Sequence, residues 1–110
     1  MNDRELLQLA AKAAGLKIIA DGTCNEGVII DLPRGRSALW DPLNDDGDAF
    51  RLANTLRLTV YHAELAVIVK HKQYSWEWIG EGVNEDTGDR DASARRAIVM
   101  GAAEIGRRMA

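Results

Sequence analysis

The spacing of apolar residues predicts three helices, one near each end of the chain and one in the middle. Leu6, Leu9, Ala10 and Ala13 form a helical stripe over 3–14, with Asn2 or Asp3 as the N-cap and Gly15 at the exit. A second helix follows Asn44 or Asp45 and runs to Leu56, and a third follows Asp89 or Asp91. The stripe of the third helix is formed by Ala94, Ile98, Gly101 or Ala102, Ile105 and Met109.

Short apolar runs between turn-forming residues predict five strands, at 16–20, 28–32, 58–61, 65–70 and 74–79. Pro33 is expected to end the second strand, with 34–37 as a polar connection, and 80–90 is expected to be a loop. The order is helix, two strands, helix, three strands, helix. We therefore expect one α+β domain over 1–110, with an antiparallel sheet of about 4–5 strands and its helices on one face.

Charge and cysteine content narrow the class of protein. The 110 residues carry 14 basic and 17 acidic side chains, a net charge of -3, which argues against general affinity for nucleic acid or anionic membranes. The single cysteine excludes an intramolecular disulfide and fits a reducing cytosol. No apolar stretch approaches the ~20 residues of a membrane span, and the first residues do not resemble a secretory signal. We expect a cytoplasmic protein with no membrane association.

The acidic run Asp45, Asp46 and Asp48 is the first candidate for chemistry. A calcium loop of the EF-hand type fails, because placing Gly47 at its sixth position puts Pro42 at the first and Ala53 at the twelfth. A carboxylate pair for a small hydrolase lacks an adjacent apolar pocket that would move either pKa. The acids are better interpreted as the start of a helix, where they interact favourably with its dipole.

Other catalytic arrangements are not supported by the sequence. Cys24, His62 and His71 lie in separate loops without the close spacing of zinc ligands, and no orienting motif surrounds the cysteine. The glycines at 80 and 82 open no helix that would cradle a phosphate. We therefore predict no metal, no cofactor and no enzymatic activity.

Half of the six aromatic residues lie close together, at Tyr74, Trp76 and Trp78. In a strand these three side chains share one face. That face is either part of the core or an exposed platform, and an exposed platform would mark a partner surface because Trp and Tyr dominate interface hot spots. Base stacking would need nearby positive charge, of which only Lys70, Lys72 and His71 are candidates.

The most specific segment is WDPLNDDGDAFRLA at 40–53, together with RRAIV at 95–99 and AAEIG at 102–106. These segments resemble small accessory proteins of temperate tailed phages, and the layout is similar to the NinX-like group of phage proteins of unknown function. The resemblance implies a viral gene expressed in a bacterial cytoplasm, and it brings no reaction, cofactor or catalytic residue. Independently of it, Pro42 biases Asp41 toward an extended conformation, so that Trp40 and Leu43 can pack around the helix start.

Together these observations predict a non-enzymatic module that binds a host or phage protein, with inhibition of a host defence protein as one version. The expected contact residues are Trp40, Asp45, Asp46, Asp48, Tyr74, Trp76 and Trp78. The alternative is a nucleic-acid-binding regulator that uses Arg34, Arg36, Arg95 and Arg96. Because 65–69 and 74–79 are apolar on both faces, a homodimer is favoured over a monomer in which 33–48 or 80–90 covers the exposed face.

Overall fold

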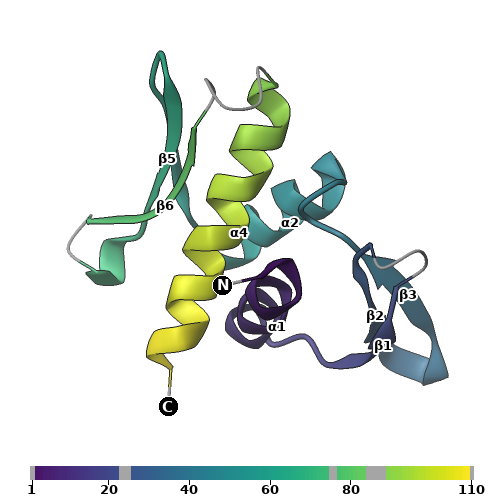
Figure 1. Ribbon diagram of the computed structural model, residues 1–110. Coiled ribbons are helices and arrows are strands. Elements are labelled where there is room, and N and C mark those ends of the chain that lie inside the picture. Colours follow the sequence, from purple (N-terminus) through teal and green to yellow (C-terminus); the bar gives the residue numbers. More distant parts are fainter. Residues whose placement is uncertain (1, 23–25, 75–76, 84–88, 110) are drawn as a thin grey trace.

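The computed structural model describes residues 2–22, 26–74, 77–83 and 89–109, and in these ranges it contains three α-helices and two three-stranded antiparallel sheets (Figure 1). In chain order the elements are α1 (Asp3–Ala14), β1 (Ile18–Asp21), β2 (Val28–Asp31), η2 (Pro33–Gly35), β3 (Ser37–Trp40), α2 (Asp46–Leu56), β4 (Thr59–His62), β5 (Ala66–Lys70), η3 (Lys72–Tyr74), β6 (Trp78–Val83) and α4 (Arg90–Arg108), where η marks a short 3-10 helix. The α+β class and the approximate order of elements are confirmed.

The expectation of a single sheet of 4–5 strands is wrong. Strands β1, β2 and β3 form sheet A, and strands β4, β5 and β6 form sheet B. The strand missing from the prediction is β3, which starts inside the expected polar connection at 34–37 and pairs with β2 from Val28↔Trp40 to Asp31↔Ser37. With β3 present, each group of consecutive strands forms a sheet of its own.

The helix ends follow the predicted capping residues closely. The Asn2 side chain accepts from the Glu5 N–H at 2.8 Å, and Gly15 takes a left-handed φ of 74° after α1. At α2 the cap is Asp45, whose carboxylate accepts from the Asp48 N–H at 2.8 Å. Asp89 caps α4 in the same way. These side-chain acceptors satisfy backbone donors of the first turn that have no partner within the helix.

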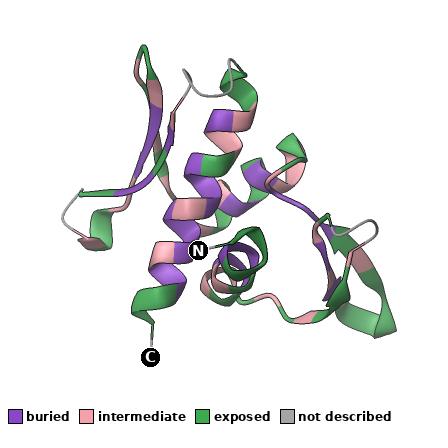
Figure 2. Cartoon of the chain, in the orientation of Figure 1, coloured by how far each residue is buried: buried purple, intermediate pink, exposed green. Residues whose placement is uncertain are grey.

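Helix α4 lies at the centre of the fold, between sheet B and the other two helices. Sheet B packs on one side of α4, and α1 and α2 pack on the other (Figure 1). Buried residues consequently lie on several sides of α4, as Figure 2 shows, and include Ala97, Val99 and Ala102 at 0% exposure. The predicted stripe described only part of this buried surface.

Glycines in β6 let the backbone of sheet B lie directly against the backbone of α4. A Cβ atom added at Gly80 would lie 2.2 Å from the Ala97 carbonyl oxygen, and one at Gly82 would lie 1.9 Å from that of Ser93. Both glycines belong to β6, which extends to Val83 and so replaces the first part of the loop expected at 80–90. On the other side of α4, a Cβ at Gly106 would lie 2.0 Å from the Leu9 carbonyl oxygen of α1.

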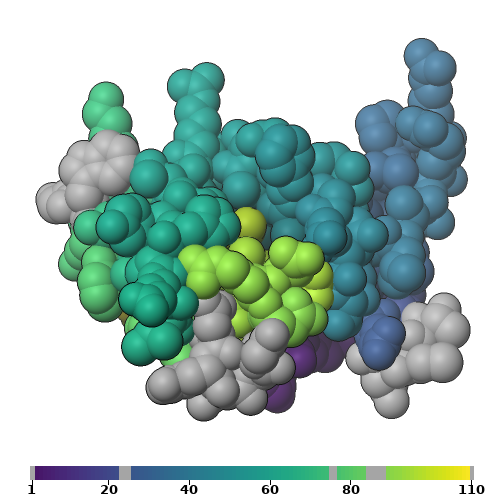
Figure 3. All heavy atoms as spheres, turned by 90° about the horizontal axis from the view of Figure 1, so that it is seen from above, coloured from purple at the N-terminus to yellow at the C-terminus, as the bar shows by residue number. Residues whose placement is uncertain are grey.

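Sheet A lies at the other end of the molecule from sheet B, as both Figure 1 and Figure 3 show. Its inner face carries Val28, Ile30 and Trp40, which are 1%, 6% and 5% exposed and belong to the hydrophobic core. Its outer face carries Leu39, which is 52% exposed. The strands of sheet A are therefore apolar on both faces, although only the inner face is covered.

Candidate functional site

The predicted aromatic triad does not form one strand face. Strand β6 begins only at Trp78, and Tyr74 is the last residue of η3. Trp76 lies outside the described residues. Tyr74 ends a short 3-10 helix whereas Trp78 begins a strand, so the two side chains have different environments.

Tyr74 packs against the C-terminal end of α4. The Arg108 guanidinium lies 4.8 Å from the centre of its ring, and the His71 ring lies 5.7 Å away. Arg108 also forms ion pairs with Glu77 at 2.5 Å and with Glu104 at 2.8 Å. Tyr74 thus helps to hold the end of α4 against the β5–β6 connection.

Trp78 lies on the outer face of sheet B, which is defined by two rows of paired residues. One row is Thr59, Lys70 and Trp78, and the other is Tyr61, Ile68 and Glu81. Cross-strand partners share a face of the sheet, so these six side chains form one surface, opposite the face that packs on α4.

The outer face of sheet B exposes two aromatic side chains over an apolar centre. Trp78 is 60% exposed and Tyr61 is 61% exposed, whereas neighbouring side chains leave Ile68 only 6% exposed. Val67 and Val69, on the inner face of the same strand, are fully buried. The expectation that β5 is apolar on both faces is confirmed. Tyr61 was missed as a candidate, although its alternation with half-buried Val60 in β4 places it on the outer face.

The 40–48 segment is mainly structural. Trp40 is buried in the core, and Pro42 is among the most fully buried residues of the chain. The Asp41 side chain accepts from the Asn44 amide at 3.1 and 3.2 Å, while Asp48 accepts from the Asp41 N–H at 2.9 Å. Trp40 belongs to the hydrophobic core, and Leu43 packs against it.

The four arginines of the nucleic-acid alternative are not brought together as a free basic patch. Arg95 bonds to Asp46 at 2.6 Å and to the Leu43 carbonyl oxygen at 2.9 Å, so it ties α4 to the start of α2. Arg96 pairs with Asp3 at 3.2 Å. Arg34 and Arg36 lie at η2 in the β2–β3 connection of sheet A. Carboxylates therefore neutralise Arg95 and Arg96, the two of these four arginines that belong to α4.

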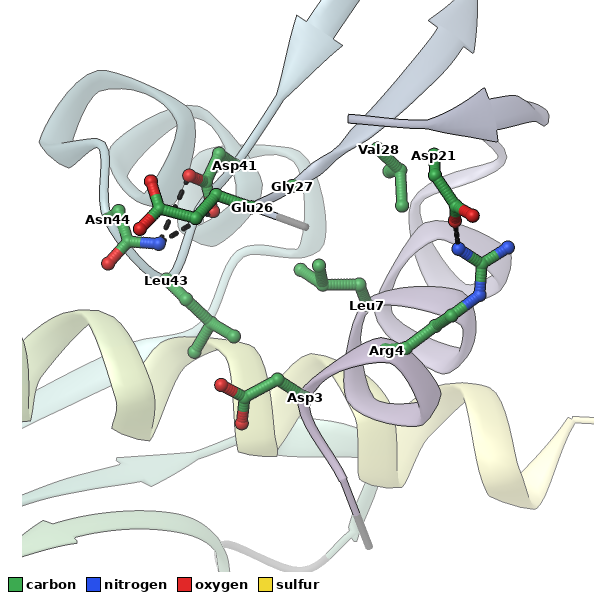
Figure 4. Close-up of a pocket in the computed structure, with 10 residues that line it drawn as sticks. All are labelled: Asp3, Arg4, Leu7, Asp21, Glu26, Gly27, Val28, Asp41, Leu43 and Asn44. Atoms are coloured by element: carbon green, nitrogen blue, oxygen red, sulfur yellow. Dashed lines mark hydrogen bonds and ion pairs between the residues drawn. The ribbon is translucent and has the colours of Figure 1, made fainter. Parts of the chain in front are cut away.

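A polar pocket of about 360 Å³ lies between the start of α1, the β1–β2 connection and the 41–44 segment (Figure 4). Leu7, Val28 and Leu43 form apolar parts of its lining. Most of its carboxylates already have partners. Asp21 forms an ion pair with Arg4 and Asp3 forms one with Arg96, while Asp41 accepts a hydrogen bond from the Asn44 amide. Arginines thus neutralise Asp21 and Asp3, whereas the partner of Asp41 is an uncharged amide.

The histidines and the cysteine are not assembled into a metal centre in the described part of the chain. No group of three His, Cys, Asp or Glu side chains within it could hold a metal ion, and Cys24 lies outside it. His71 instead has a structural role. Its Nδ1 accepts from the Gln73 N–H at 3.0 Å, so the proton is on Nε2, which donates to the Leu56 carbonyl oxygen at 3.0 Å.

Comparison with protein-family models, with curated proteins and with solved structures finds no match to this chain. In the described residues, no helix combines the length and the apolar character needed to cross a lipid bilayer. The function proposed below therefore depends on the chain's own surface and on the resemblance given above.

Proposed function

We propose that this chain is a phage accessory protein that acts as a non-enzymatic protein-binding module. The observation that carries the proposal is the outer face of sheet B, where Trp78 and Tyr61 are each about three-fifths exposed. Large aromatic side chains contribute much contact area with little loss of side-chain entropy, which is why they are frequent at binding hot spots. Lys70 and Glu81 on the same face supply charges of both signs at its edge.

The partner is a host or phage protein in the bacterial cytoplasm, as the resemblance to the NinX-like group implies. A small module that covers a functional surface of a host defence protein would inhibit it without chemistry of its own. A standard interface buries about 800 Å² on each partner. Trp78 and Tyr61 would lie near the centre of such an interface.

The test compares two matched double variants in capture from bacterial host lysate. Tyr61→Ala with Trp78→Ala removes the aromatic face, and Leu39→Ala with Phe50→Ala removes two similarly exposed side chains elsewhere, at 52% and 66% exposure. We expect the wild type and the control to retain the same protein, and the sheet B variant to lose it. Retention of one set of proteins by all three chains, or no specific retention by the wild type, would refute the proposal.

Self-association is the competing use of the same face. A second copy seated on the outer face of sheet B would give the two-fold dimer that the sequence favours. Sedimentation equilibrium at tens of micromolar, a rough choice for a standard interface, distinguishes the two uses. A dimer that dissociates in the Tyr61/Trp78 double variant would assign this face to a second copy of the chain.

A further inference from the structure

We infer that the pocket between sheet A and α2 is a binding site for a small apolar molecule that ends in an oxygen acceptor, such as a carboxylate. The pocket has a volume of about 400 Å³ and is separate from the outer face of sheet B. Sites for small ligands are mostly apolar concavities of about 300–1,000 Å³ with a few polar groups that orient the ligand. This pocket has that composition.

Its walls come from three elements. Ile30, Ala38 and Trp40 line it from the inner face of sheet A, with Leu52 from α2 and Leu16 from the segment after α1. Ile30 and Ala38 are directly paired across β2 and β3, so they present adjacent side chains to the pocket. Ala38 is the small member of this pair, and its size leaves room between the sheet and the helix.

The polar side chains that line the pocket all come from one side, helix α2. Asp48, Arg51 and Thr55 line it from α2. Each carboxylate oxygen of Asp48 already accepts a hydrogen bond, Oδ2 from the Asp41 N–H at 2.9 Å and Oδ1 from Arg51 Nη2 at 2.7 Å. The Nε and Nη1 groups of Arg51 donate to no acceptor within the described residues. Guanidinium N–H donors thus remain available there.

Charge complementarity follows from this arrangement. A guanidinium with unused donors matches a carboxylate or carbonyl oxygen, since Arg presents planar, forked N–H groups to such acceptors. The ligand would therefore place its apolar body between Trp40 and Leu52 and its acceptor at Arg51.

The experiment measures binding of 1-anilinonaphthalene-8-sulfonate, an aromatic probe with an anionic acceptor, by its fluorescence. Ala38→Leu fills the pocket from the sheet, and Thr55→Trp fills it from the exposed side of α2. We expect saturable binding at one site, weakened at least about tenfold by either filling variant, because the apolar surface that the probe would bury is then occupied. Arg51→Met should weaken binding about fivefold through the loss of its donors.

Two exposed positions serve as controls for location. Phe50→Ala and Trp78→Ala remove exposed apolar side chains that do not line the pocket, and both should leave the affinity unchanged. Decanoate should displace the probe at lower concentration than decylamine, which has the same chain but a head group that only donates. The inference is overturned if binding is not saturable, if Trp78→Ala abolishes it, if filling variants with wild-type thermal stability still bind normally, or if decylamine competes as well as decanoate.

Discussion

We expect Gly80→Ala to destabilise the protein, because the backbone of β6 lies directly against the backbone of α4. This is so although alanine is in general the better residue for a strand. In an open strand the substitution would stabilise by roughly 0.5–1 kcal/mol, because glycine loses more conformational freedom on folding. At position 80 the new Cβ would lie 2.2 Å from the Ala97 carbonyl oxygen and 2.5 Å from the Gly101 nitrogen. Both are backbone atoms of α4 that cannot rotate away.

The magnitude follows from the shift that α4 would need. Ordinary van der Waals contact starts at 3.4 Å, so a distance of 2.2 Å requires the helix to recede by about 1.2 Å. Val67 and Val69, both at 0% exposure beneath α4, would lose close packing as it recedes. Overpacking a core costs about 1–3 kcal/mol, and more where backbone must move, so we expect a net loss of roughly 1–3 kcal/mol. For a domain of this size that corresponds to a fall of about 5–15 °C in Tm.

Urea unfolding followed by far-UV circular dichroism and tryptophan fluorescence measures the change. Gly47→Ala is the matched control, because its Cβ would meet mainly the mobile guanidinium of Arg51, at 3.2 Å. We expect that variant to be as stable as the wild type or up to about 1 kcal/mol more stable, as helix propensity dictates. A Gly80→Ala protein that unfolds at or above the wild-type urea midpoint would show that α4 does not pack on β6 at this distance.

Three further outcomes follow from the described contacts. Asp45→Ala should cost about 1 kcal/mol in urea unfolding, since the cap of α2 is lost. Trp40→Ala should cost about 3–5 kcal/mol, whereas Trp78→Ala should stay within about 0.5 kcal/mol; equal losses would contradict their burial. Hydrogen bonds from Arg107 and Arg108 outweigh the effect of burial and lower the pKa of Glu104 from 4.5 to about 2. The stabilisation by Glu104 is therefore complete above pH 4.5 and is lost as the pH falls toward 2. Acid should thus destabilise the wild type more than the Glu104→Gln variant. The expected difference is only about 1 kcal/mol, because solvent screens ion pairs that are as exposed as these.

Local structure was predictable from the sequence where a side chain acts on its own backbone. Asn2, Asp45 and Asp89 cap the three helices because a short acceptor at the N-cap reaches the next turn in any tertiary context. Strand pairing between neighbours, such as β1 with β2, follows from short connections. These interactions depend on a few consecutive residues, which the sequence displays directly.

The sheet arrangement could not be derived in this way. Whether strands 28–32 and 65–70 join one sheet depends on edges that apolar periodicity does not encode. The polar residues around Ser37 concealed β3, whose alternation spans only four residues. At 80–83, two glycines suggested a loop, but they occur there because α4 leaves no room for a side chain. Only the packed structure distinguishes a glycine needed for close contact from one that forms a turn.

For the candidate site, the residue types in the sequence indicated which side chains could form an interface, but the sequence did not predict which of them are exposed. Trp40 and Trp78 are equivalent in composition, yet one is 5% and the other 60% exposed. The difference arises from register: Trp40 pairs with Val28 on the inner face of sheet A, while Trp78 follows η3 and pairs with Lys70 on the outer face of sheet B. A bulge near Ile79 changes which side chains face the core, and no periodicity within 74–79 predicts it.

The central position of α4 also determines how the two proposed sites relate to each other. The outer face of sheet B and the pocket beside sheet A share no residue, and the two sheets lie at opposite ends of the molecule (Figure 3). Coupling between distant sites requires an element with two alternative arrangements that both sites bias. Helix α4 is a poor candidate, because Gly80, Gly82 and Gly106 hold it against β6 and α1 at distances that leave no room for sliding. Occupation of the pocket should thus leave the affinity of the sheet B face unchanged, so that a small ligand and a protein partner bind independently.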